Sequence, residues 1–94
     1  MISDTSRQAY KDIKESLTER QRMVFEYVKR LGPFCNFQIK KGLGWEINRV
    51  TPRVLELRKM GLLLPDGMRL SPTGKMANFW KAREEFKDFQ LNLL

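Results

Sequence analysis

The first strong periodic segment covers residues 19–31. Apolar residues recur there at helical spacing, and those that share one face are Met23, Val24, Tyr27, Val28 and Leu31. Thr18 and Gln21 have the spacing of a capping box, in which two side chains bond the free amides at the start of a helix. Gly32 and Pro33 follow as a stop signal. The pattern predicts a first core helix over residues 19–31.

Two weaker helical segments flank this one. In residues 3–16 and just after, Tyr10, Ile13 and Leu17 share a face, which predicts a short N-terminal helix. On the other side, Asn36 is suited to cap a helix of barely two turns that ends near residues 42–44. Phe34 and Cys35 are expected to form a short extended connector before it.

The third core helix is predicted over about residues 48–60, with Met60-Gly61 as its end. Its inward stripe at 100° per residue consists of Ile47, Val50, Val54 and Leu57. Pro52 has no amide hydrogen and therefore fits best within the first turn. Either Asn48 begins the helix and Pro52 distorts it slightly, or a turn leads to Thr51 as N-cap. Both alternatives place residues 48–53 at the N-terminal end.

After residue 61 the pattern changes to that of a hairpin. Residues 62–64 are predicted as a first strand, residues 65–67 as a turn or bulge, and residues 71–74 as a second turn. Residues 76–81 alternate in the manner of a return strand. A competing interpretation places a helix over residues 71–86. We expect the strand, followed by a C-terminal helix or tail.

The chain of 94 residues is expected to form one domain, with a core at 17–83 and a C-terminal helix or tail at 84–94. Its net charge of +7 is unevenly placed. Residues 37–83 carry ten Lys or Arg against three Asp or Glu, a net of +7 in that region alone. A localised basic region attracts polyanions by releasing their counterions.

Composition also excludes several kinds of chemistry. The sequence has no histidine, so Ser-His and Cys-His nucleophile pairs and histidine metal sites are impossible. Its one cysteine, Cys35, is expected to be a small buried residue, and the methionines are expected to fill the core. We therefore expect a protein that is not an enzyme and needs no cofactor. No apolar run approaches the roughly 20 residues of a membrane span. A single cysteine cannot form an internal disulfide, which favours a reducing compartment and hence a cytoplasmic or nucleoid-associated protein.

Three helices followed by a hairpin resemble a winged helix-turn-helix domain, mostly α with a small β-hairpin, over about residues 17–83. "LTERQRMVFEYVKRLGP" looks like the first helix of such domains and "NFQIKKGLGW" like the second. "NRVTPRVLELRKMGLL" looks like the third, the recognition helix, with the entry to the wing. "RVLELRKMGLL" is similar to the ending common in MarR-like regulators. "RVTPRVLELRKMGL" followed by "TGKMANFW" is similar to small phage and prophage winged-helix proteins.

The resemblance implies sequence-specific binding of double-stranded DNA, with the third helix in the major groove and the wing on the backbone. The protein would be a transcriptional regulator or a phage-type accessory DNA-binding protein. The side chains expected at the DNA are Lys40, Lys41, Asn48, Arg49, Thr51, Pro52, Arg53, Lys59, Arg69 and Lys75. One such domain buries limited DNA surface, so a homodimer through residues 3–16 or 84–94 is an open alternative.

Leu55 fits this scheme least well. It lies about 140° from the buried direction of its helix, where a polar side chain is expected. It could pack against the second helix or the wing, or it could contact another protein. The alternative function is accordingly a winged-helix interaction module within a larger complex that does not bind DNA. Such a module would use Leu55, Phe86, Phe89 and the terminal "LNLL". Trp45 and Trp80 are expected to pack in the core or wing.

Overall fold

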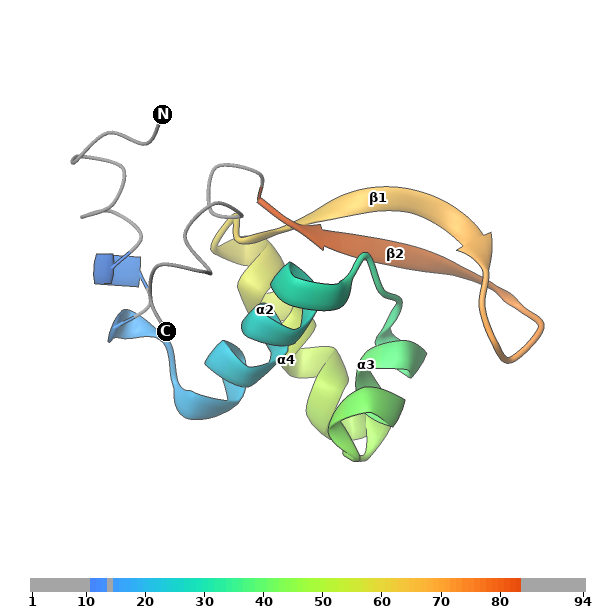
Figure 1. The fold of residues 1–94 in the computed structure, drawn as a ribbon, viewed down its shortest axis with the longest axis horizontal. Helices are drawn as coiled ribbons and strands as arrows, with labels where there is room; N and C mark the ends of the chain where they lie inside the picture. Colours follow the sequence, from blue (N-terminus) through green and yellow to red (C-terminus); the bar gives the residue numbers. More distant parts are fainter. Residues whose placement is uncertain (1–10, 14, 84–94) are drawn as a thin grey trace.

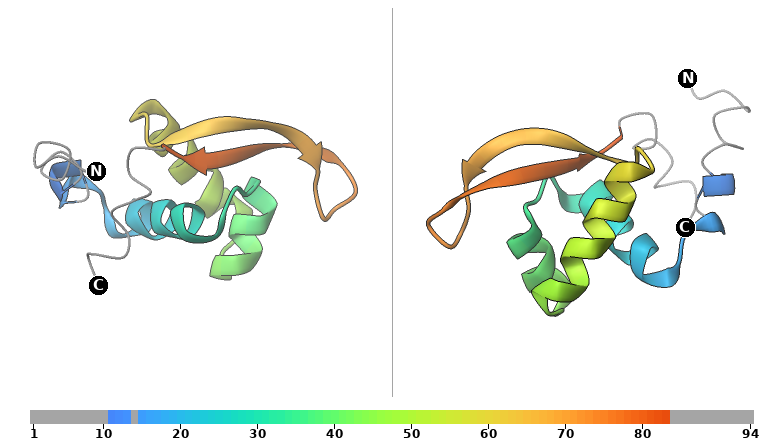
Figure 2. Two further views of the ribbon diagram at one scale, coloured as in Figure 1. Left: turned by 45° about the horizontal axis from the view of Figure 1, so that its top comes forward. Right: turned by 180° about the vertical axis from the view of Figure 1, so that it is seen from behind.

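The computed structural model describes residues 11–13 and 15–83. Three helices, α2 (Glu19–Leu31), α3 (Asn36–Leu43) and α4 (Ile47–Lys59), precede an antiparallel hairpin of β1 (Leu63–Leu70) and β2 (Met76–Ala82) (Figure 1). Residues 11–13 and 15–16 are also helical. The remainder of the predicted N-terminal helix and all of residues 84–94 lie outside the described residues. The two turned views in Figure 2 show the hairpin as a long ribbon that extends beyond the helices.

Helix α2 has the predicted bounds and the predicted capping box. Thr18 Oγ1 accepts a hydrogen bond from the Gln21 amide at 3.2 Å, and Gln21 Oε1 accepts one from the Thr18 amide at 3.0 Å. Its buried apolar side chains are Val24, Phe25 and Val28. Met23 and Leu31 are exposed, so their place in the buried stripe was predicted wrongly. The buried face of α2 is centred nearer Phe25 than the predicted stripe was, because α2 packs against both α4 and β2.

Helix α3 begins one residue from where the sequence suggests. Cys35 is the N-cap and Asn36 is the first helical residue, so the prediction of Asn36 as N-cap is wrong. The Asn36 side chain is used elsewhere, since its Oδ1 accepts a hydrogen bond from Trp80 Nε1 at 2.9 Å. The predicted extended connector is confirmed. Phe34 forms a β-bridge with Trp80, and the two residues exchange backbone hydrogen bonds of 3.0 and 2.8 Å.

Helix α4 starts earlier than expected and contains Pro52 in its interior. Glu46 is the N-cap, which excludes the alternative with Thr51 in that role. Val50, Val54 and Leu57 are buried as predicted. Ile47 is 43% exposed, so its assignment to the stripe is wrong. It lies at the edge of the stripe defined by the other three and at the free end of the helix.

The hairpin confirms the return strand and excludes a helix over residues 71–82. Gly61, with a φ of 77°, turns the chain from α4 into β1 as a left-handed residue that glycine adopts without strain. Strand β1 is longer than predicted, because residues 65–67 form a bulge and do not end the strand. The true turn is at residues 71–75, where the Ser71 amide donates to the Lys75 carbonyl at 2.8 Å.

The hydrophobic core lies between the three helices and the base of the hairpin. Its members are Val24, Phe25, Val28, Ile39, Val50, Val54, Leu57, Leu62, Leu63, Trp80 and Ala82. Trp80 belongs to this core and Trp45 packs against it, as predicted for both tryptophans. Cys35 is buried, also as predicted. The architecture is a winged helix-turn-helix: mostly α, with α3 and α4 as the helix pair and the β1–β2 hairpin as the wing.

Candidate nucleic-acid interface

The outward face of α4 is polar at both ends and apolar in the middle. The residues that share it, spaced four, three and four apart, are Asn48, Pro52, Leu55 and Lys59. Asn48, Leu55 and Lys59 are exposed, while Pro52 is half-buried. Arg49 and Thr51 lie on the two flanks and are also exposed. The predicted division of this helix into a core face and an outward face is therefore confirmed for these residues.

Several outward side chains of α4 are not engaged within the protein. In the part of the chain that the structure describes, no ion pair or side-chain hydrogen bond occupies Asn48, Arg49 or Lys59. Asn48 and Arg49 lie in the first turn, where the backbone amides give the helix its partial positive charge. Glu46 precedes them and forms no side-chain cap hydrogen bond. Donors that are already exposed and unpaired lose no internal partner when they bind a base edge or a phosphate.

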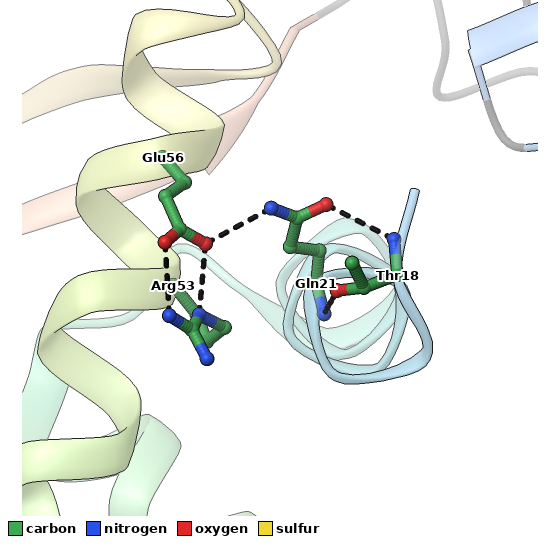
Figure 3. A network of polar contacts seen from close by, with 4 residues as sticks. All are labelled: Thr18, Gln21, Arg53 and Glu56. Atoms are coloured by element: carbon green, nitrogen blue, oxygen red, sulfur yellow. Dashed lines mark hydrogen bonds and ion pairs between the residues drawn. The ribbon is translucent and has the colours of Figure 1, made fainter. Parts of the chain in front are cut away.

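Arg53 differs from Arg49, because its guanidinium is bound within the protein (Figure 3). Arg53 Nη2 donates to Glu56 Oε2 at 2.9 Å, and Arg53 Nε lies 2.8 Å from Glu56 Oε1. The side chain is only 25% exposed, which agrees with the predicted position near the core boundary. Arg53 and Glu56 are three positions apart, the spacing at which opposite charges pair on a helix, so this pair could have been predicted from the sequence.

The same carboxylate joins α4 to the start of α2. Gln21 Nε2 donates to Glu56 Oε1 at 2.9 Å, while the other end of the Gln21 amide completes the capping box with Thr18 (Figure 3). The hydrogen bond from Gln21, and after it the contacts with Arg53, hold the pKa of Glu56 below its usual value. The network orients Arg53 along the helix surface and fixes α2 against α4.

The two lysines of α3 lie in its last turn. Lys41 is exposed and Lys40 is half-buried. Their Nζ atoms lie 6.0 and 5.9 Å from the centre of the Phe37 ring, near the outer limit of a cation–π contact. Both ammonium groups are thus placed beside one aromatic ring on the surface of α3.

The two basic residues predicted on the wing are in different situations. Arg69 Nη2 pairs with Asp66 Oδ2 at 2.7 Å, and the guanidinium lies 4.9 Å from the centre of the Phe79 ring. Its charge is therefore largely compensated. Lys75 is exposed in the turn and lines a cleft of about 240 Å³ together with Asn36 at the start of α3. Of the two, Lys75 is better placed for an external anion.

Sequence reasoning missed an apolar surface on the distal part of the hairpin. Met68, Leu70 and Met76 are 60%, 67% and 59% exposed. The pairing of Leu70 with Met76 and of Met68 with Asn78 places the three on one face of the ribbon. The expectation that methionines fill the core is wrong for these two and for Met23 and Met60, all of which are exposed. The reason for the two hairpin methionines is that the ribbon extends past the helices that bury its base.

A further basic residue of α4 was also missed. Arg58 is exposed, and its guanidinium lies 4.3 Å from the centre of the Trp80 ring. It stacks on the hairpin from the last turn of the helix. At 100° per residue it lies about 80° from Val50, on the same flank of the helix as Thr51, and this position was the available signal.

Two possible roles find no support in the described residues. Among residues 11–13 and 15–83, no three His, Cys, Asp or Glu side chains gather where they could hold a metal ion. The helices of this part of the chain are too short or too polar to cross a membrane.

Comparison with known proteins supports the fold. No protein-family model matches the chain, and no curated protein sequence does. Among solved structures, a possible transcriptional regulator from Methanosarcina mazei Go1 is similar, with a TM-score of 0.60. The match covers 92% of this chain and 81% of that one at 13% sequence identity. At that identity the likeness is one of fold.

Proposed function

We propose that this protein binds double-stranded DNA in a sequence-specific manner through the outward face of α4. The observation that carries the proposal is the exposed, unpaired state of Asn48 and Arg49 at the start of that helix. A helix of this width fits the major groove of B-form DNA. Arginine can bind guanine O6 and N7 with two hydrogen bonds, and asparagine can bind adenine in the same way.

The remaining basic side chains suit the phosphate backbone. Lys40 and Lys41 on α3, Lys59 on α4 and Lys75 in the hairpin turn are single charges that can position the protein without reading sequence. Residues 37–83, with a net charge of +7, hold all of them. Arg53 and Arg69 contribute less directly, because Glu56 and Asp66 already bind their guanidinium groups.

The protein would act by occupying its site and would perform no chemistry. A solved structure of the same fold is described as a possible transcriptional regulator, which supports a regulatory role. The alternative to a transcriptional regulator is a phage-type accessory DNA-binding protein, which would bind DNA in the same way. A homodimer through residues 3–16 or 84–94, and a cytoplasmic or nucleoid location, remain predictions.

The test is a fluorescence anisotropy titration of a mixed-sequence duplex at a low and a moderate salt concentration. Binding should weaken steeply as salt rises, because each phosphate contact releases counterions. On a duplex selected from a random library, Arg49→Gln should lower affinity by a factor of about 5 to 100, the range for one arginine that reads a base. Arg30→Gln removes the same charge from an exposed site on α2 and should have a much smaller effect.

The hairpin favours a second candidate function, that of a protein-interaction module. The face of Met68, Leu70 and Met76 is an apolar surface of the kind that marks protein contacts. If the folded protein does not bind the duplex even at low salt, DNA binding is wrong and this module becomes the better explanation of the fold.

A further inference from the structure

Leu55 is a large apolar side chain in the middle of the outward face of α4. It is 45% exposed and does not belong to the hydrophobic core. Asn48 and Lys59, at the two ends of the same face, are polar or charged. Leu55 therefore contributes little to folding stability, and a polar residue would be tolerated equally well at this exposed position.

Two of the explanations for such a leucine are poorly supported. With nearly half of its surface exposed, Leu55 is not sequestered by α3 or by the wing. A protein-docking surface needs a contiguous apolar patch of several hundred Å². Next to Leu55 on its face only the half-buried Pro52 is apolar.

The major groove of DNA offers a partner of matching size. The C5-methyl group of thymine projects into that groove and is its distinctive apolar feature, and it is read by apolar side chains. We propose that Leu55 contacts the C5-methyl group of a thymine and thereby sets part of the sequence preference. The proposal rests on the proposed function, since it assumes that α4 lies in the major groove.

The position of Leu55 along the helix indicates where this thymine should lie. Leu55 follows Asn48 by two turns, about 10 Å along the axis at 1.5 Å per residue. At about 3.4 Å per base pair, this separation spans at most about three base pairs, so the thymine should lie within about three base pairs of the base that Asn48 reaches. The apolar contact is thus flanked by a hydrogen-bonding side chain on one side and by Lys59 on the other.

The experiment removes only the methyl group. Duplexes are first selected from a random library with the wild-type protein, and each thymine of the selected site is then replaced by deoxyuridine, one position at a time. At one position the change should weaken wild-type binding by a factor of about three to five, as expected for one buried methyl group. With Leu55→Ala the same replacement should have no effect. Leu70→Ala, which alters an exposed leucine on the hairpin, should keep the full sensitivity.

The outcomes separate this inference from the function on which it rests. Specific binding that tolerates deoxyuridine at every position would overturn the role of Leu55 and leave DNA binding intact. The same conclusion follows if the selected site has no thymine, or if Leu55→Ala keeps the sensitivity. Failure to select any duplex would overturn both. Thermal unfolding of Leu55→Ala should match the wild type, because the side chain is exposed.

Discussion

Helix α4 and the β1–β2 hairpin both have a buried part and an exposed part, but the helix has a buried face whereas the hairpin has a buried end. In the helix, a buried face with Val50 and Leu57 and an exposed face both run the whole length, and the exposed face is polar except for Pro52 and Leu55. In the hairpin, the end next to the helices is buried and the end near the turn is exposed. Leu63 at its base is buried, while Leu70, on the same strand near the turn, is exposed. Burial in the helix follows its own periodicity, whereas burial in the hairpin depends on how far the helices reach beneath it.

As a result, the two exposed surfaces differ in chemistry. The outward face of α4 offers Asn48 and Arg49 as free hydrogen-bond donors. The distal hairpin offers mainly apolar surface, with the exposed Lys75 in its turn. In the account proposed above, α4 reads the bases, and the hairpin supplies Lys75 to the backbone.

The largest expected effect tests the division of the hairpin. Leu63→Ala should lower the free energy of unfolding by about 2 to 5 kcal/mol, because it leaves a cavity in the core. Leu70→Ala should change it by less than about 0.5 kcal/mol, because the side chain already faces solvent. Urea unfolding of both variants measures the difference. Equal losses would mean that the distal hairpin is packed.

A smaller effect tests the division of α4. Arg53→Gln breaks the partly buried pair with Glu56 and should lower the free energy of unfolding by about 1 kcal/mol. Arg49→Gln should leave stability within about 0.5 kcal/mol of the wild type while it weakens DNA binding. Unfolding and anisotropy measurements on the same two variants give both quantities. The assignment fails if Arg53→Gln weakens DNA binding more than Arg49→Gln does.

The smallest effect concerns pH. The folded protein holds the pKa of Glu56 below its usual value of 4.5, so the ionised carboxylate stabilises the fold at and above that value. This contribution is lost as pH falls from about 4.5 through the lowered pKa. The stability difference between the wild type and Glu56→Gln should therefore shrink on acidification. Glu19→Gln, at an exposed site on α2, is the matched control. A difference that stays constant down to pH ~3 would contradict the role of the network.

The local sequence pattern was sufficient to predict those features of the fold that depend on residues close together in the sequence. The capping box at Thr18, three of the four predicted residues of the inner stripe of α4 and the turn at residues 71–74 were predicted correctly. Features that depend on distant residues were not. Gln21 and Glu56 are 35 positions apart, and no spacing rule could join them. The pairing of Arg53 with Glu56, by contrast, follows the i, i+3 spacing of a helix.

The hairpin and α3 show the same limit. The alternation of apolar residues in β1 and β2 predicts a shared face and gives no indication of whether anything covers it. Met68 and Met76 were expected in the core only because methionine commonly fills core gaps, and both are exposed. Asn36 has the chemistry of an N-cap, but the indole of Trp80, brought close by the β-bridge to Phe34, takes its side-chain oxygen.

The most direct test of the central claim is an NMR titration of the 15N-labelled protein with a selected duplex. We predict that the largest amide shift changes occur at residues 47–59, with smaller changes in α3 and in the turn at residues 71–75. This pattern would place the outward face of α4 against the DNA. Shift changes confined to the distal hairpin, at residues 68–70 and 76–78, or the absence of changes at low salt, would contradict it.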